Sequence, residues 1–150
     1  MNIISQILQA RKELTTYRVG LLQTKVYRAL KEKTATALVP YKMTSTEWAF
    51  LGMISEYPNG VRSLVLADIL GVEAPFITAL VSKFKKKGIV YVIKNDEDKR
   101  VKPIALTPEG HRLAKEIESV LRNESRKWRE GISPRELLTY ITVLKKLNDN

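Results

Sequence analysis

The side chains best suited to chemistry in this sequence are cations, and they gather between Ala74 and Lys102. Eight basic and three acidic residues there supply half of the net charge of +10. A cation excess in a small chain favours a polyanionic partner, although a lysine run at a helix end is also favoured by the helix dipole alone. The basic residues are Lys83, Lys85, Lys86, Lys87, Lys94, Lys99, Arg100 and Lys102, and the acids are Asp96, Glu97 and Asp98.

The composition argues against most other kinds of site. The chain has no Cys and one His, which excludes thiolate zinc sites, disulfides and multi-His metal sites. Its sequence contains no glycine-rich phosphate loop and no Ser-His-Asp set. His111 stands in the first turn of an expected helix, where a lone His usually faces solvent. We therefore expect no enzyme, no catalytic residue, no metal and no cofactor.

Length and hydropathy favour one globular domain over residues 1–150. With 44% hydrophobic and 28% charged residues, the chain resembles neither a disordered nor a membrane-embedded protein. No apolar run approaches the ~18 residues that span a bilayer. The first residues lack the charged and apolar regions of a secretory signal. These features predict a cytoplasmic protein that does not contact a membrane.

Helices at both ends of the chain should frame the cation-rich stretch. Residues 3–36 are expected to form one long helix, because their apolar residues are spaced alternately four and three apart. Such a seam could pack on its own domain or on a second chain. The seam consists of Ile3, Ile7, Ala10, Leu14, Tyr17 and Leu21. A helix from 108 to about 128 begins after the cap Thr107, and a capping box at residues 133–136 opens a last helix to about 148. That helix places Leu137, Ile141, Leu144 and Leu147 at core spacing.

Between these ends the pattern predicts three helices and a hairpin. A capping box formed by Thr44 and Glu47 opens a helix to about Tyr57. Helices over 63–70 and 74–87 follow, separated by a three-residue turn, and Gly88 ends the second of them. Two strands come next, over 89–93 and 101–106, and Pro103 indicates a sheet edge. The inner face of the first helix should hold Trp48, Leu51, Ile54 and Ser55.

Two helices joined by a short turn and followed by a hairpin are typical of a winged helix-turn-helix. The fold class is therefore mainly α with a small β-hairpin wing. On the 74–87 helix, the apolar face should pack against the preceding helix, and small and cationic side chains should face outward. Such a face can enter a DNA major groove, although it would also suit an ordinary solvated helix. The inward residues are Ile77, Leu80, Val81 and Phe84, against Leu66, Ile69 and Leu70, whereas Pro75, Phe76, Thr78, Ala79, Ser82, Lys83 and Lys86 face outward or flank that face.

The hairpin loop carries a second candidate contact with DNA. Asp98 stands two residues before Arg100, and Lys94, Lys99 and Lys102 offset the acidic charge of the loop. We interpret Asp98 as orienting Arg100 toward a narrow, negative minor groove. The alternative is a surface ion pair worth under about 1 kcal/mol.

Five segments of the sequence also match a known family. With them the chain resembles the MarR family of bacterial and archaeal transcription regulators, most strongly over residues 61–110. The resemblance implies a homodimer clasped by the terminal helices, two winged lobes on a palindromic operator and a small-ligand cleft. The segments are Leu66–Val72, Thr78–Val81, Lys86–Val90, Asp98–Arg100 and Leu106–Gly110.

We thus expect a winged core over about 44–107, with dimerisation helices over about 3–36 and 108–148. The expected function is that of a dimeric transcription regulator that binds double-stranded DNA selectively by sequence or shape and acts as a repressor. Relief of repression by a small aromatic or anionic ligand is a further hypothesis. The rival is a winged-helix module that binds a protein and has lost specific DNA readout. The candidate DNA-binding residues are Ser63, Pro75, Phe76, Thr78, Ala79, Ser82, Lys83, Lys86, Lys94, Asp98, Lys99 and Arg100.

The residues of a ligand site stay open at this point. Aromatic side chains beside a cation would suit a phenolic anion, and several stand outside the winged core. For Trp48, core packing is the favoured role. The residues that could line such a cleft are Tyr17, Arg18, Tyr27, Tyr41, Trp48 and Trp128.

Overall fold

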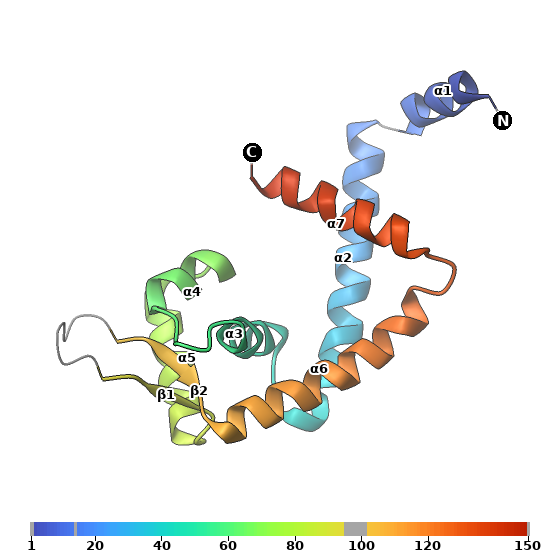
Figure 1. The fold of residues 1–150 in the computed structure, drawn as a ribbon. Helices are drawn as coiled ribbons and strands as arrows, with labels where there is room; N and C mark the ends of the chain where they lie inside the picture. The colour runs from blue at the N-terminus through green and yellow to red at the C-terminus, as the bar shows by residue number, and fades with distance from the viewer. Residues whose placement is uncertain (1, 14, 95–101, 150) are drawn as a thin grey trace.

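The computed structural model describes residues 2–13, 15–94 and 102–149. The chain folds into a lobe of short helices with a hairpin, flanked by a frame of longer helices (Figure 1). The elements are α1 (Ile3–Glu13), α2 (Thr16–Leu38), η1 (Val39–Tyr41), α3 (Ser45–Ser55), α4 (Ser63–Leu70), α5 (Ala74–Lys86), β1 (Val90–Val92), β2 (Ile104–Leu106), α6 (Pro108–Trp128) and α7 (Pro134–Asn148). This is the expected class, mainly α with a small two-stranded wing.

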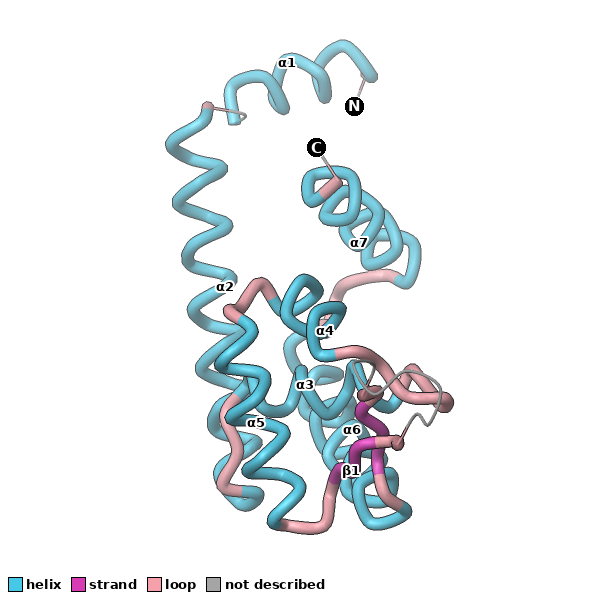
Figure 2. The backbone as a smooth tube through the Cα atoms, turned by 90° about the vertical axis from the view of Figure 1, so that its left-hand side faces the viewer, coloured by secondary structure: helices cyan, strands magenta, loops and turns pink. Residues whose placement is uncertain are grey.

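The prediction of one helix over 3–36 was wrong. Helix α1 ends at Glu13, and α2 begins at Thr16 after an extended Thr15 (φ −75°, ψ 136°). Threonine has low helix propensity and favours the position before a first turn, so adjacent Thr15 and Thr16 make a break at this point inexpensive. Figure 2 shows α1 lying across the end of the upright α2. The apolar spacing that crosses Thr15 therefore does not form a single helical seam.

Helix α3 lies at the centre of the lobe. Its capping box forms as predicted, and Leu51 and Ile54 are buried. Ser55 was wrongly assigned to the inner face, because it is exposed and its hydroxyl donates to the Gly52 carbonyl (2.6 Å). Phe50, which was not predicted as a core residue, is buried on the inner face of α3. Its ring stacks on that of Phe84, with ring centroids 5.8 Å apart.

Helices α4 and α5 form the expected helix-turn-helix. They meet at a bend of 113°, and Gly71 takes the left-handed conformation (φ 62°) that ends α4. Ile77, Leu80 and Phe84 are buried, as the apolar pattern of α5 predicted. Ile69 was expected in the same contact, but it is 43% exposed and lines a groove between α3, α4 and α6, whereas Leu66 is buried.

Within the described ranges, no single helix has the length and apolar character to cross a membrane, and only α4 and α5 taken together as a bent pair match those two criteria.

The hairpin and α6 are held together by close backbone packing. Strand β1 pairs with β2 in antiparallel register, with Val90 opposite Leu106, and Val61 adds a bridge to Ile104. Strand β2 begins later than predicted, directly after Pro103, which has no N–H to donate to a ladder. The Thr107 hydroxyl accepts the Gly110 N–H (3.0 Å) and donates to the Gly88 carbonyl (2.6 Å). This cap ties the start of α6 to the end of α5.

The C-terminal helices match the sequence prediction closely. Helix α6 ends at Trp128, Gly131 has a positive φ of 81°, and α7 opens on the predicted capping box of Ser133 and Glu136. Apolar side chains along α7, however, are exposed rather than packed in a core of this chain. They include Leu138, Tyr140, Ile141, Val143, Leu144 and Leu147.

Candidate nucleic-acid interface

The outward face of α5 carries the side chains that the sequence analysis placed there. All of the predicted contact residues of α5 are exposed, and the exposed fraction of Phe76 is 43%. The Thr78 hydroxyl donates to the Ala74 carbonyl (3.2 Å), so only its lone pairs face outward. These residues are Pro75, Phe76, Thr78, Ala79, Ser82, Lys83 and Lys86. The face therefore combines small and apolar groups near its start with cations near its end.

The cations at the end of α5 differ in their surroundings. Lys85, Lys86 and Lys87 are exposed, and the ammonium of Lys87 lies over the Phe84 ring, 5.8 Å from its centroid. Among the described residues, no acid forms an ion pair with Lys85 or Lys86. Lysines in such a position carry full charge into solvent, which suits contact with phosphate.

Lys83 is paired, which the sequence analysis did not anticipate. Its ammonium donates to Oε1 of Glu47, at the start of α3, while Oε2 of Glu47 accepts the Thr44 N–H (2.9 Å). Glu47 is buried, with a residue exposure of 7%. Burial alone would raise the pKa of Glu47, but hydrogen bonds from Lys83 and Thr44 hold that pKa below its ordinary value. The carboxylate is thus charged, and each of its two oxygens accepts a hydrogen bond within the lobe.

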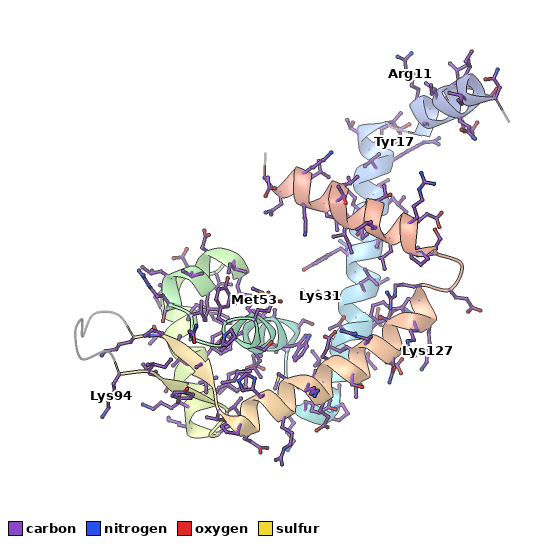
Figure 3. The ribbon with its side chains drawn as sticks, viewed as in Figure 1. Arg11, Tyr17, Lys31, Met53, Lys94 and Lys127 are labelled. Atoms are coloured by element: carbon purple, nitrogen blue, oxygen red, sulfur yellow. The ribbon has the colours of Figure 1, made fainter. Side chains whose placement is uncertain are left out.

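The wing residues are described only in part. Lys94 is exposed at the end of the hairpin strand, and Figure 3 shows it on the side of the lobe that is remote from α2. Asp98, Lys99 and Arg100 lie outside the described residues, so the proposed Asp98–Arg100 unit stays a hypothesis. Ser63 is half-buried as the first residue of α4.

Two grooves separate the lobe from the framing helices. The first, about 870 Å³, is lined by α3, α4 and α6 and includes Met53, Ile69 and His111. The second, about 730 Å³, lies between α2, α3 and α6. Trp48 is half-buried and lines both grooves, and it also packs against the hydrophobic core, as favoured from sequence.

The second groove is rich in arginine. Arg122, Arg126 and Arg129 line it together with Trp48 and Trp128. The Arg122 guanidinium pairs with Glu118 (2.9 Å), and Arg129 donates to the Ser125 hydroxyl (3.1 Å). These arginines were not singled out from sequence, because a helix surface with charges three and four residues apart is typical of simple solvent exposure.

The other aromatic candidates for a ligand site lie elsewhere. Tyr17 and Tyr27 are exposed on α2, more than 60% in each case, and the Tyr41 hydroxyl donates to Oε1 of Glu116 (3.0 Å). Burial and this neighbouring carboxylate raise the pKa of Tyr41. Within the part of the chain that is described, no cluster of three His, Cys, Asp or Glu side chains could hold a metal ion.

Comparison with known proteins shows which family the winged part of the chain is similar to. A family model described as "MarR family" matches residues 41–101, which contain α3, α4, α5 and β1. Over 86% of its length the chain also superposes on CouR from Rhodococcus jostii RHA1, solved with bound p-coumaroyl-CoA, with a TM-score of 0.79, 25% identity and 90% of that chain covered. Residues 41–101 therefore resemble the MarR family, and the chain shares the fold of solved members of that family.

Further solved structures share the fold of this chain. A MarR-family transcriptional regulator from Rhodococcus sp. RHA1 matches with a TM-score of 0.79 at 23% identity, over 90% of this chain and 95% of that one. The S. aureus MepR–DNA complex matches with a TM-score of 0.73 at 21% identity, over 87% and 96% of the two chains. The resemblance stated from the sequence is thereby confirmed, and so is the winged helix-turn-helix.

The start of α5 lacks a side-chain cap. Glu73 stands directly before α5, and its side chain makes no capping hydrogen bond. Its exposed carboxylate adds a negative charge at the start of α5. The first turn of α5 therefore offers no favourable anion site, unlike the lysine-rich last turn.

Proposed function

We propose that this chain is a dimeric transcription regulator that binds double-stranded DNA, acting as a repressor on a palindromic operator. The observation that carries the proposal is the exposed face of α5, with small side chains along its length and, at its end, Lys85 and Lys86, which have no ion partner among the described residues. Residues of about 44–107 would bind DNA, and the helices within about 3–36 and 108–148 would join two copies. The proposal assigns no catalytic residue, metal or cofactor to the chain.

The apolar start of α5 suggests how a base sequence would be read. Pro75, Phe76 and Ala79 offer no hydrogen-bond donor or acceptor from their side chains, so they cannot make bidentate contacts with base edges. Contact with thymine methyl groups and readout of groove shape are the modes that such a surface allows. Lys94, Lys99 and Arg100 would supply the shape-dependent part from the wing.

Replacing Lys86 tests the DNA-binding role of α5. Lys86 is exposed and has no ion partner among the described residues, so we expect it to contact phosphate. Lys86→Ala should weaken binding to all duplexes alike and should lower the magnitude of the slope of log Kobs against log salt by about one for each chain of the dimer. Fluorescence anisotropy over a salt series measures both effects. A loss confined to one operator variant would show instead that Lys86 reads a base.

The exposed apolar surface of the terminal helices supports a dimer. Helices α1, α2 and α7 expose many large aliphatic and aromatic side chains, among them Ile3, Leu21, Ile141 and Leu144. One lobe of this size cannot cover such a surface, and exposed patches of this extent mark protein–protein contacts. Sedimentation equilibrium should give a dimer at micromolar concentration. A monomer under those conditions would exclude the proposed assembly.

A ligand-responsive form of the regulator is supported by the arginine-rich groove. CouR, a relative with the same fold, was solved with p-coumaroyl-CoA, a ligand that has aromatic and anionic parts. Trp48 and Trp128 could stack on an aromatic ring, and Arg126 could pair with an anionic group. We therefore assign a small aromatic anion as the effector class, with the groove between α2, α3 and α6 as its site.

The rival function is that of a protein-interaction module. It is favoured by Phe76, which is 43% exposed in the first turn of the helix that would enter the groove. An aromatic side chain in this position would also suit a protein partner. Salt dependence separates the two functions, because an apolar protein contact releases no counterions.

A further inference from the structure

The Glu47–Lys83 pair links two helices that have different tasks. Glu47 belongs to the first turn of α3, and Lys83 belongs to the last turn of α5, so the pair spans 36 residues of sequence. A capping box alone requires one oxygen of Glu47, and Gln could supply it equally well. The second oxygen is used by Lys83. The negative charge of Glu47 therefore has a use beyond capping α3.

The pair fixes one end of α5. Its ion pair and the stack of Phe50 on Phe84, with an interplanar angle of 20°, both join α3 to the last two turns of α5. Helix α5 also packs against α4 and β1, and its Ile77 and Leu80 are buried. The bonds to α3 add a constraint at the C-terminal end of α5, so Glu47 helps to set how the outward face of α5 is presented.

The pair also neutralises one of the cations on the surface of α5. The side chain of Lys83 is 42% exposed, whereas that of Glu47 is 9% exposed. Detaching Lys83 would leave a buried carboxylate without its partner, which is strongly unfavourable. Lys83 therefore keeps its intramolecular partner, while Lys85 and Lys86 stay available to an external anion.

We propose that Glu47 is a positioning residue for the DNA-facing helix and that Lys83 serves as its intramolecular anchor rather than as a phosphate contact. The inference rests on the proposed DNA binding and revises the role expected for Lys83 from sequence. It predicts that removing the charge of Glu47 strengthens non-specific binding, because one more lysine becomes available to phosphate.

Glu47→Gln tests this directly, since Gln keeps the shape and the capping bond. The probe is a scrambled 30-base-pair duplex, and the readout is the salt slope of binding. The magnitude of the slope should rise by about 1.8 for the dimer, about 0.9 for the phosphate contact added by each of its two chains. Lys83→Gln should leave the slope of the parent protein unchanged, and the double variant Glu47→Gln/Lys83→Gln should cancel the rise. Glu130→Gln, which changes the same net charge at an exposed position, is the matched control and should have no such effect.

The outcomes separate the inference from the function on which it rests. A fall of about 1.8 in the magnitude of the slope in Lys83→Gln, about 0.9 for each chain as expected for Lys86→Ala, would make Lys83 a phosphate contact and overturn the inference. An unchanged slope in Glu47→Gln would also overturn it, leaving Glu47 as a helix cap only. If the parent protein itself shows no salt-dependent binding to any duplex, the proposed function fails, and this inference fails with it.

Discussion

Replacing Gly110 with alanine should destabilise the fold by about 3 kcal/mol or more, because the added methyl group has no space. A Cβ at this position would lie 2.1 Å from the Ile89 carbonyl oxygen and 3.2 Å from Cβ of Leu106. The Ile89 oxygen cannot move away easily, since it accepts the Thr107 N–H (3.0 Å). The whole junction of β1, β2 and α6 would have to shift.

Thermal unfolding followed by circular dichroism at one protein concentration measures this effect. For a chain of this size, a loss of about 3 kcal/mol lowers the Tm by about 6–12 °C. Gly52→Ala is the matched control, because a Cβ there meets nothing within 4 Å in the interior of α3. Alanine at that position should stabilise the protein by about 0.5–1 kcal/mol. Equal Tm values for Gly110→Ala and the parent would contradict the packing described for the wing.

Replacing Arg100 with alanine should weaken DNA binding by about 1–3 kcal/mol, with the greater loss at A·T-rich flanks. A long cation at the end of a hairpin loop can follow the floor of a narrow minor groove, where the negative potential is strongest. Folding and dimerisation should be unaffected. Anisotropy with duplexes that differ only in their flanks measures the loss, and sedimentation checks the assembly.

Asp98→Ala provides the companion test of the wing. If Asp98 holds the Arg100 guanidinium or the loop backbone in place, its removal should cause a weaker version of the same defect. The aspartate carries negative charge and cannot itself favour contact with phosphate. Tighter binding by Asp98→Ala would show that Asp98 acts only by repulsion, and the Asp98–Arg100 unit would have to be abandoned.

The local features of the fold could be predicted from sequence because they depend on neighbouring residues. Both capping boxes, opened by Thr44 and Ser133, form at the predicted residues, since each involves side chains only three positions apart. The apolar face of α5 was correct for the same reason, because a spacing of three and four residues decides which side is buried. The family resemblance depended on such short segments.

The predictions that failed concern features that depend on contacts between distant segments. The exposure of Ile69 depends on how α4 packs against its neighbours, which periodicity alone does not determine. The partner of Lys83 is 36 residues away in sequence, so the pattern around Lys83 resembled any solvated lysine. The break before Thr16 could have been found, because two adjacent threonines interrupt the helix-forming residues there.

The candidate DNA contacts divide in a similar way. The face of α5 was predicted by helical periodicity, and every residue assigned to it is exposed. Which lysines of that face form ion pairs was not predictable, because this depends on whether an acid from another helix reaches each lysine. Glu47 reaches Lys83, and no described acid pairs with Lys86.

The salt dependence of binding to mixed-sequence duplexes tests the central claim most directly. A dimer that places two α5 helices and two wings on DNA should contact several phosphates, so log Kobs should fall linearly with log salt. We predict a loss of affinity of about a thousandfold or more between roughly 50 and roughly 200 mM salt, as expected for about six or more phosphate contacts. Binding that is absent, or that does not change with salt, would contradict the account and would favour a protein partner for the exposed face of α5.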